Sequence, residues 1–205
     1  MIEITDIIEY VGTFAFAISG IRLASAKKFD WFGAFVVGAA TATGGGTLRD
    51  ILLDTTPFWM SNPSYLIITG LAVFFVIVFG KKLIHLNNTF FIFDTIGLGL
   101  FTVVGIEKGM AFGFPIWISV IMGIMTGSVG SVIRDILINE EPLLFRKDIY
   151  ALACLAGGLV YFPLHYLGVT PIVTQLVAAG SVIFVRLIAV KYHISLPVLK
   201  GEPDN

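Results

Sequence analysis

The fold is decided by the stretch Thr43-Gly44-Gly45-Gly46-Thr47-Leu48-Arg49-Asp50, which lies inside an apolar run long enough to cross a membrane. Glycine is a poor helix former, about 1 kcal/mol worse than alanine at each position. Arginine and aspartate at membrane depth are costly unless other groups satisfy them. A helix that only had to span lipid would contain neither feature, so this stretch predicts a functional break in a transmembrane helix.

The same pattern returns in the second half of the chain. Directly after Gly127, the stretch Ser128-Val129-Gly130-Ser131-Val132-Ile133-Arg134-Asp135 repeats the glycine and the Arg-Asp pair 85 residues later (134 minus 49). Chance similarity is the alternative, but the unbroken Arg-Asp-Ile-Leu in both copies and the aligned Pro57 and Pro142 argue against it. Two glycine-interrupted, charged helices in matching positions of two halves indicate a transport site.

Composition places the chain in a membrane. It is 57% hydrophobic and 13% charged, with a mean hydropathy of +0.92, whereas soluble domains carry about 25% charged residues. The net charge of -1 gives no indication of a nucleic-acid partner, and the expected surroundings are membrane lipid. The acidic N-terminus lacks the basic region of a signal peptide, so we expect the first helix to be retained.

Seven stretches are long and apolar enough for transmembrane helices, at about 20 residues per crossing. They run near 5–23, 31–53, 65–79, 91–106, 115–138, 149–166 and 171–191; the third is short, and an earlier start near Met60 is the alternative. The tail over 194–205 contains two prolines and is expected to be loose. We therefore predict an all-α integral membrane protein with one transmembrane domain over residues 1–205.

Basic residues predict the orientation. If the spans alternate in direction, nine basic residues lie on one side, and only Lys108 lies on the other. The nine are Arg22, Lys27, Lys28, Lys81, Lys82, Arg146, Lys147, Lys191 and Lys200. Because loops rich in lysine and arginine stay in the cytoplasm, we expect a multi-pass protein of the cell membrane with the N-terminus outside and the C-terminus in the cytoplasm.

Each half of the chain holds three spans, over about 5–80 and about 90–166, and a seventh helix at about 171–192 stands outside the repeat. Three is an odd number, so the second half enters the membrane from the opposite side. The halves are therefore expected to form an inverted repeat about an approximate two-fold axis in the membrane plane. We expect the second and fifth helices to be kinked at their glycines.

The glycines have two interpretations. They let a helix unwind and turn backbone carbonyls toward an ion path, or they let two helices pack closely. Three glycines beside a charged pair favour the pore-lining break. The expected ion path follows both motifs: Thr43, Gly44, Gly45, Gly46, Arg49, Asp50, Gly127, Ser128, Gly130, Ser131, Arg134 and Asp135.

The motif charges need partners. Adjacent residues on a helix point about 100° apart, so Arg49 and Asp50 are not expected to pair with each other. We expect Glu9 to pair with Arg49 and Asp94 with Arg134, since the two acids are also 85 residues apart (94 minus 9). The two remaining motif carboxylates then attract cations at the two mouths of a pore. The alternative is that all six side chains form structural salt bridges.

Signals for catalysis are missing from the sequence. The three histidines are scattered without metal-ligand spacing, no phosphate- or dinucleotide-binding glycine motif occurs, and Gly127-Ser128 lacks the Gly-x-Ser-x-Gly frame of hydrolases. We therefore expect no enzyme activity, no metal and no cofactor. Arg186 is expected either to reach the cytoplasmic face or to meet an acid, and Glu107 with Lys108 to form an exposed pair.

These residues carry a family resemblance. Gly-Gly-Gly-Thr-Leu-Arg-Asp at 44–50, Gly-Ser-Val-Ile-Arg-Asp at 130–135, the two three-span halves and the seventh span resemble the trimeric intracellular cation (TRIC) channels. The match is closest to their prokaryotic branch, also catalogued as a glycine-transporter domain family, and covers about 9–191. The resemblance implies a homotrimer with a pore inside each protomer, walled by the kinked second and fifth helices and passing the monovalent cations K⁺ and Na⁺.

One departure from the family is plain. Animal members use a Lys-Glu-Val triplet in phosphoinositide binding, and its absence here puts such lipid regulation and a role in intracellular calcium stores in doubt. A passive monovalent cation channel is the leading hypothesis. One alternative is a secondary transporter of a small solute such as glycine, which also needs inverted repeats and broken helices. A scaffold without transport is the weakest, because buried Arg-Asp pairs are expensive.

Overall fold

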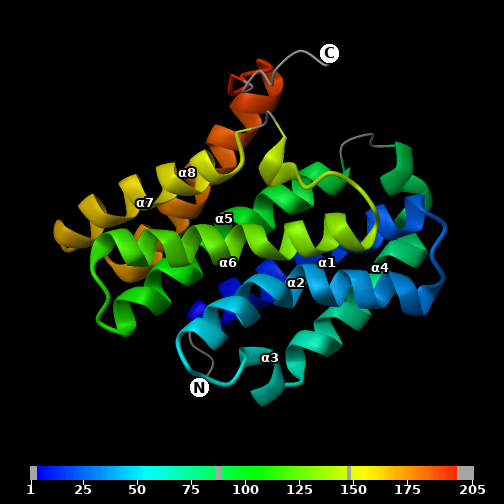
Figure 1. The fold of residues 1–205 in the computed structure, drawn as a ribbon, viewed down its shortest axis with the longest axis horizontal. Coiled ribbons are helices and arrows are strands. Elements are labelled where there is room, and N and C mark those ends of the chain that lie inside the picture. The colour runs from blue at the N-terminus through cyan, green and yellow to red at the C-terminus, as the bar shows by residue number, and fades with distance from the viewer. Residues whose placement is uncertain (1–3, 86–88, 147–148, 198–205) are drawn as a thin grey trace, which may run out of the picture.

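Helices account for almost all the regular structure of the computed structural model, which describes residues 4–85, 89–146 and 149–197 (Figure 1). The elements are α1 (Ile4–Ala26), α2 (Trp31–Leu52), α3 (Phe58–Ser61), α4 (Ser64–His85), α5 (Thr89–Ala111), α6 (Ile116–Leu137), the 3-10 turn η1 (Leu143–Phe145), α7 (Ala151–Tyr166) and α8 (Pro171–Lys191). The predicted all-α fold is confirmed. Most of the expected tail, and Lys147 and Lys200 of the orientation argument, lie outside the described residues.

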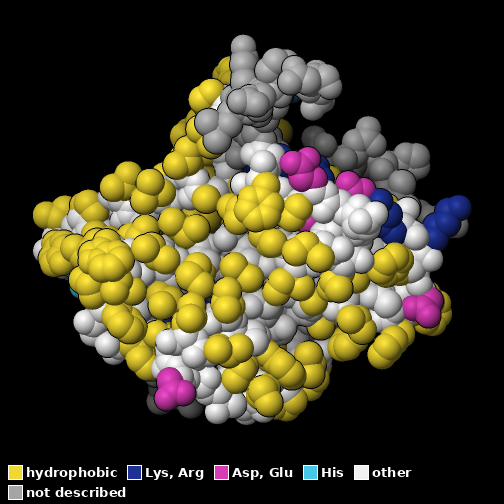
Figure 2. Space-filling model, viewed as in Figure 1, with side chains coloured by type: hydrophobic (Ala, Val, Ile, Leu, Met, Phe, Trp, Pro, Cys, Tyr) yellow, Lys and Arg dark blue, Asp and Glu magenta, His cyan; other side chains and the backbone are white. Residues whose placement is uncertain are grey.

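Four of the described helices are long and apolar enough to cross a membrane: α1, α5, α6 and α8. α7 and the stretch 64–80 of α4 are apolar but shorter, and α2 is made less apolar by its glycines, threonines and terminal charges. Figure 2 shows hydrophobic side chains over much of the visible surface, with charged ones gathered toward the side where α6 ends. Exposed apolar surface of this extent indicates a multi-pass membrane protein, and the count of seven spans stays a prediction.

The third expected span proves to be two elements. α3 covers only Phe58–Ser61, and α4 begins at Ser64. Asn62 between them has an extended backbone, with φ -141° and ψ 110°. It precedes Pro63, and a residue before proline is pushed out of the helical region. The earlier start near Met60 therefore corresponds to a separate short helix.

The core mixes the two halves of the chain. α1 packs against α2 and α5, and α6 packs against α5 and α2. α4 lies on α1 and α2, whereas α7 and α8 pack together beside α5 and α6. Figure 1 shows α2 and α6 side by side and running in opposite directions. This antiparallel crossing brings the two glycine motifs together and sends their Arg-Asp pairs to opposite ends of the molecule, called here the Arg49 end and the Arg134 end.

The contacts between α2 and α6 repeat each other at the 85-residue shift. A Cβ added at Gly45 would lie 2.1 Å from the Thr126 carbonyl oxygen, and one added at Gly130 would lie 2.1 Å from the Thr41 carbonyl oxygen. Exchanging the halves turns one contact into the other, because positions 41 and 45 become 126 and 130. Contacts that exchange in this way are what an approximate two-fold axis produces.

Two phenylalanines mark the same relation between α1 and α5. Phe16 and Phe101 are equivalent at the 85-residue shift, and their rings stack with centroids 5.4 Å apart. Gly97 leaves room for the first ring and Gly12 for the second, since a Cβ at either glycine would lie within 3.2 Å of a ring carbon. The pair therefore packs across the approximate axis.

The glycine motifs do not unwind their helices. α2 is helical without interruption from Trp31 to Leu52, and α6 from Ile116 to Leu137. The expected pore-lining break is therefore not seen, and close packing is the observed role of these glycines. Their missing Cβ atoms let the two backbones touch, and at Gly46 a Cβ would collide with Phe58 at 2.4 Å.

Candidate functional site

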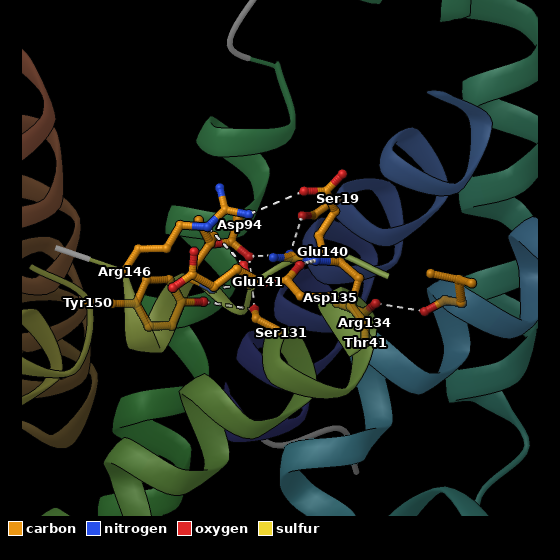
Figure 3. Close-up of polar contacts among 12 residues, drawn as sticks. Ser19, Thr41, Asp94, Ser131, Arg134, Asp135, Glu140, Glu141, Arg146 and Tyr150 are labelled. Atoms are coloured by element: carbon orange, nitrogen blue, oxygen red, sulfur yellow. Dashed lines mark hydrogen bonds and ion pairs between the residues drawn. The ribbon is translucent and has the colours of Figure 1, made fainter. Parts of the chain in front are cut away.

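A buried charged cluster lies at the Arg134 end. Arg134 and Asp94 are fully buried, and Asp135 is 2% exposed. Arg134 Nη1 lies 2.5 Å from Asp94 Oδ1, and Arg134 Nε donates to Asp135 Oδ1 at 2.8 Å. Arg134 Nη1 also donates to Ser19 Oγ at 2.9 Å (Figure 3). The predicted pairing of Asp94 on α5 with Arg134 on α6 is present.

Hydrogen bonds extend this cluster to Tyr150 at the start of α7, and a cation–π contact extends it to Arg186 on α8. Ser131 donates to Asp94 at 2.9 Å, and the Tyr150 hydroxyl donates to Ser131 at 2.7 Å. The guanidinium of Arg186 lies 4.7 Å from the ring centroid of Tyr150 and 5.0 Å from that of Phe91. Arg186 Nη1 also donates to the Ile149 carbonyl oxygen at 3.1 Å. Among the described residues, two aromatic rings and this carbonyl, rather than an acid or the surface, hold Arg186, which is 1% exposed. Such a desolvated cation–π contact contributes about 2 kcal/mol.

At the Arg49 end, the motif arginine and the acid on α1 have different partners from their counterparts at the Arg134 end. Arg49 Nη2 lies 2.7 Å from Asp50 Oδ1, and Arg49 Nε donates to the same oxygen at 2.8 Å. Glu9 accepts a hydrogen bond from the Tyr65 hydroxyl. No ion pair between Glu9 and Arg49 occurs among the residues that the structure describes. The predicted pairing of Glu9 with Arg49 is therefore wrong.

Each motif arginine pairs with the aspartate that follows it, which corrects the expectation that adjacent residues point apart. The 100° separation holds for the Cβ directions, whereas a long arginine side chain folds around the last helical turn. The second carboxylate oxygen is also occupied: Asp50 Oδ2 accepts from Phe58 N at 2.9 Å, and Asp135 Oδ2 accepts from Leu143 N at 3.0 Å. Both carboxylates thus hold the chain that follows their helix, and neither is free.

The acid of the first half is a glutamate and that of the second half an aspartate, and neighbouring residues explain this difference. In the second half, Ser131 bridges Tyr150 to Asp94. The equivalent of Ser131 is Gly46, which has no hydroxyl, and the equivalent of Asp94 is glutamate, one methylene longer. The longer side chain of Glu9 reaches its tyrosine directly. The extra reach replaces the serine bridge, and the carboxylate of Glu9 bonds to the tyrosine instead of forming an ion pair with the arginine.

A second difference changes the hydrogen-bond partners of the motif arginine. Ser19 accepts a hydrogen bond from Arg134, but its equivalent 85 residues later is Val104, which has no hydroxyl. Arg49 Nη1 is buried and has no hydrogen-bond partner among the described residues. The guanidinium instead lies over the ring of Phe58, 5.7 Å from its centroid. At the Arg134 end, Arg134 Nη2 and Asp94 Oδ2 are likewise buried without a hydrogen-bond partner among the described residues. The two ends therefore differ in what contacts the motif arginine: Asp94 and Ser19 at one end, and the ring of Phe58 at the other.

A further polar cluster was not predicted. Glu107, expected in an exposed pair with Lys108, accepts from the Tyr161 hydroxyl at 3.0 Å. Gln175 Nε2 donates to both of its carboxylate oxygens, at 2.7 and 2.8 Å. These bonds tie α5 to α7 and α8. The sequence signal that could have revealed the cluster is Gln175, an amide inside an apolar span.

Fold and site together define a multi-pass, all-helical membrane protein built from two matching halves. Residues 6–81 and 91–166 each match the family model described as Glycine transporter. The second match begins and ends 85 residues after the first (91 minus 6 and 166 minus 81). The chain belongs to the family that this model describes.

Relatives and solved structures agree with this assignment. The UPF0126 inner membrane protein YadS of Escherichia coli strain K12 is 36% identical over 201 residues, which cover 97% of each chain. The TRIC orthologue of Rhodobacter sphaeroides has the same fold, with a TM-score of 0.87 and 29% identity over 93% of this chain and 99% of that one. A TRIC cation channel solved in work on conductance has a TM-score of 0.86 and 34% identity, covering 98% and 100%. These are membrane proteins and channels, not enzymes.

Proposed function

We propose that this chain is a TRIC-type channel for the monovalent cations K⁺ and Na⁺, assembled as a homotrimer with a pore inside each protomer. The observation that carries the proposal is the likeness to a solved TRIC cation channel, at 34% identity over 98% of the chain with a TM-score of 0.86. Such likeness along the whole length includes both motifs and all seven proposed spans.

The proposed path runs beside the crossing of α2 and α6, along the motif residues 43–50 and 127–135. The approximate two-fold relation supports this location, because it places the glycines of both motifs against each other where α2 and α6 cross. The hydroxyls of Thr43 and Ser128 donate to carbonyls of their own helices at 2.8 and 2.7 Å, which leaves oxygen lone pairs for a passing cation. We propose that α2 and α6 bend at their glycines when the path opens.

Charge balance at the two ends supports cation passage. Arg134 faces Asp94 and Asp135, and Arg49 faces Asp50. Neither end therefore presents an unbalanced motif arginine that would repel a cation. Glu9 has no cationic partner among the described ion pairs and offers a carboxyl oxygen to the Tyr65 hydroxyl at the Arg49 end.

We place the protein in the cell membrane of a prokaryote, with the Arg134 end in the cytoplasm. Lys27 and Arg146 lie at that end of the molecule, beside the cavity that Arg134 lines. Lys108 near the end of α5 is on the opposite side. This distribution follows the positive-inside rule.

A secondary transporter of a small zwitterion such as glycine is the second candidate. The description of the family model names such a transporter. The free Nη1 of Arg49 is a donor for a carboxylate, and Glu9 supplies a carboxylate for an amine. A transporter of this kind would use the Arg49 end as its binding site.

Recording from planar bilayers in asymmetric KCl tests the proposal. We expect unitary current steps that reverse near the K⁺ potential and are altered by Asp50→Asn and by Arg134→Ala. Asp54→Asn is the matched control, because Asp54 is exposed and its φ of 52° suits asparagine. A bilayer without currents, together with saturable uptake of labelled glycine into liposomes, would reject the channel proposal in favour of the transporter.

A further inference from the structure

A cavity of about 260 Å³ lies beside the buried cluster at the Arg134 end. Its lining combines Arg134 and Asp135 with three charged side chains from the connecting segments, Lys27, Glu140 and Arg146. The three side chains are about 40% exposed, whereas the motif pair beneath them is buried. The cavity therefore leads from the surface of the protein to the buried Arg134 and Asp135 of the second motif.

Glu140 joins a cation from each half of the chain across this cavity. Lys27 Nζ lies 2.6 Å from Glu140 Oε1, and Arg146 Nη2 lies 3.6 Å from Glu140 Oε2. Arg146 Nε also donates to the Glu141 carbonyl at 2.8 Å. Figure 3 shows Arg146 directed toward Glu140 near the cluster of Arg134. Lys27 follows α1, and Glu140 and Arg146 lie between α6 and α7, so the link connects the first half to the second.

The residues equivalent to this link at the Arg49 end cannot form it. At the 85-residue shift, the equivalents of Lys27, Glu140 and Arg146 are Phe112, Thr55 and Ser61. None of these carries a charge. The link is therefore not a by-product of the repeat but a property of the Arg134 end.

We propose that Lys27, Glu140 and Arg146 form an ionic latch that keeps the Arg134 end closed over the cavity. The inference rests on the proposed channel function, because the latch regulates entry to the same path. Separating the α1–α2 connection from the α6–α7 connection breaks the contact of Lys27 with Glu140 and opens the cavity toward Arg134 and Asp135. Exposed ion pairs are weak, so the latch biases the equilibrium between closed and open states and releases readily.

Electrostatics favour the latched state at neutral pH. Lys27, through its hydrogen bond and its charge, lowers the pKa of Glu140 below the usual value, and Arg146 adds to this effect. The carboxylate therefore stays ionised while both cations are charged. High salt screens charges at such an exposed site, so the latch should weaken as the KCl concentration rises.

Single-channel open probability tests the latch. We expect Lys27→Gln and Glu140→Gln each to raise it by about two- to fivefold at 0.1 M KCl, the range that exposed ion pairs supply. The double variant should rise no further than either single one. Lys27→Glu with Glu140→Lys should lower the open probability below that of Lys27→Glu alone, without reaching the wild-type value, because Arg146 then faces a like charge at position 140. Lys28→Asn is the matched control: it removes a neighbouring charge at a position whose φ of 62° suits asparagine. Variants that match this control, or effects that simply add, would overturn the latch.

Labelling of an engineered cysteine separates the latch from the channel. Ile138 lines the cavity and is 4% exposed, so Ile138→Cys reports on its opening. The natural Cys154 is fully buried and serves as the unreactive reference. We expect a cationic thiol reagent, applied to that side of vesicles, to react several-fold faster when Lys27→Gln is also present. An unchanged rate would overturn the latch even if the protein conducts, whereas a faster rate in a protein without currents would support it and reject the channel.

Discussion

Replacing Gly45 with alanine tests the backbone contact between α2 and α6. The new Cβ would lie 2.1 Å from the Thr126 carbonyl oxygen, and ordinary contact begins at 3.4 Å, so the helices would have to separate by about 1.3 Å. Overpacking of this kind costs about 1–3 kcal/mol, and the better helix propensity of alanine returns at most about 1 kcal/mol. We therefore expect Gly45→Ala to lower the free energy of unfolding by about 1–2 kcal/mol.

Thermal unfolding in detergent micelles, followed by helical circular dichroism, measures the effect. A loss of 1 kcal/mol corresponds to about 2–4 °C in Tm for a chain of this size. Gly130→Ala is the symmetry check, because its Cβ would meet the Thr41 carbonyl oxygen at the same 2.1 Å. Gly70→Ala is the control, since no atom lies within 4 Å of a Cβ there, and it should be neutral or slightly stabilising. Wild-type stability in Gly45→Ala would refute the close contact, and clearly unequal losses in the two motif variants would refute their equivalence.

Three further predictions follow from the charged groups. Asp94→Asn removes an ionic partner of the buried Arg134 and should lower the free energy of unfolding by about 3–5 kcal/mol. Glu9→Gln loses only a hydrogen bond and should lower it by about 1 kcal/mol. Equal losses in denaturant titrations would contradict the difference in bonding between the two ends. Arg186→Lys keeps the positive charge but removes the planar guanidinium between two aromatic rings. It should lower the free energy of unfolding by about 1–2 kcal/mol, measured by thermal unfolding. An unchanged stability would show that the rings surround this side chain without stabilising it. Because the pKa of folded Glu140 is lowered, the latch contributes above the ordinary carboxyl pKa and is lost as the pH falls through the lowered value. Open probability should therefore rise below about pH 4 on that side, and a rise that persists in Glu140→Gln would point to another group.

The sequence predicted the helices of the fold better than the ion pairs and hydrogen bonds between them. Six of the expected spans have helical counterparts with similar bounds, and the third divided where Pro63 interrupts it. The ion pair of Asp94 with Arg134 was predicted from the repeat alone and is present. The same reasoning failed for Glu9 with Arg49, because the two halves differ at the positions that bond to these side chains. Gly46 is equivalent to a serine in the second half, and Val104 is equivalent to a serine in the first half.

The sequence by itself determined the membrane class, the helical elements and the two related halves, because apolar length and an 85-residue repeat are properties of the linear chain. Tertiary structure decided what the glycines and charges do. Gly45 and Gly130 pack backbones together rather than break helices, since their neighbours lie on the other half of the chain. The contact of Lys27 with Glu140 joins residues 113 positions apart. Hydrogen bonds and ion pairs act over a few ångströms, so their partners are set by which helices adjoin and how far each side chain reaches.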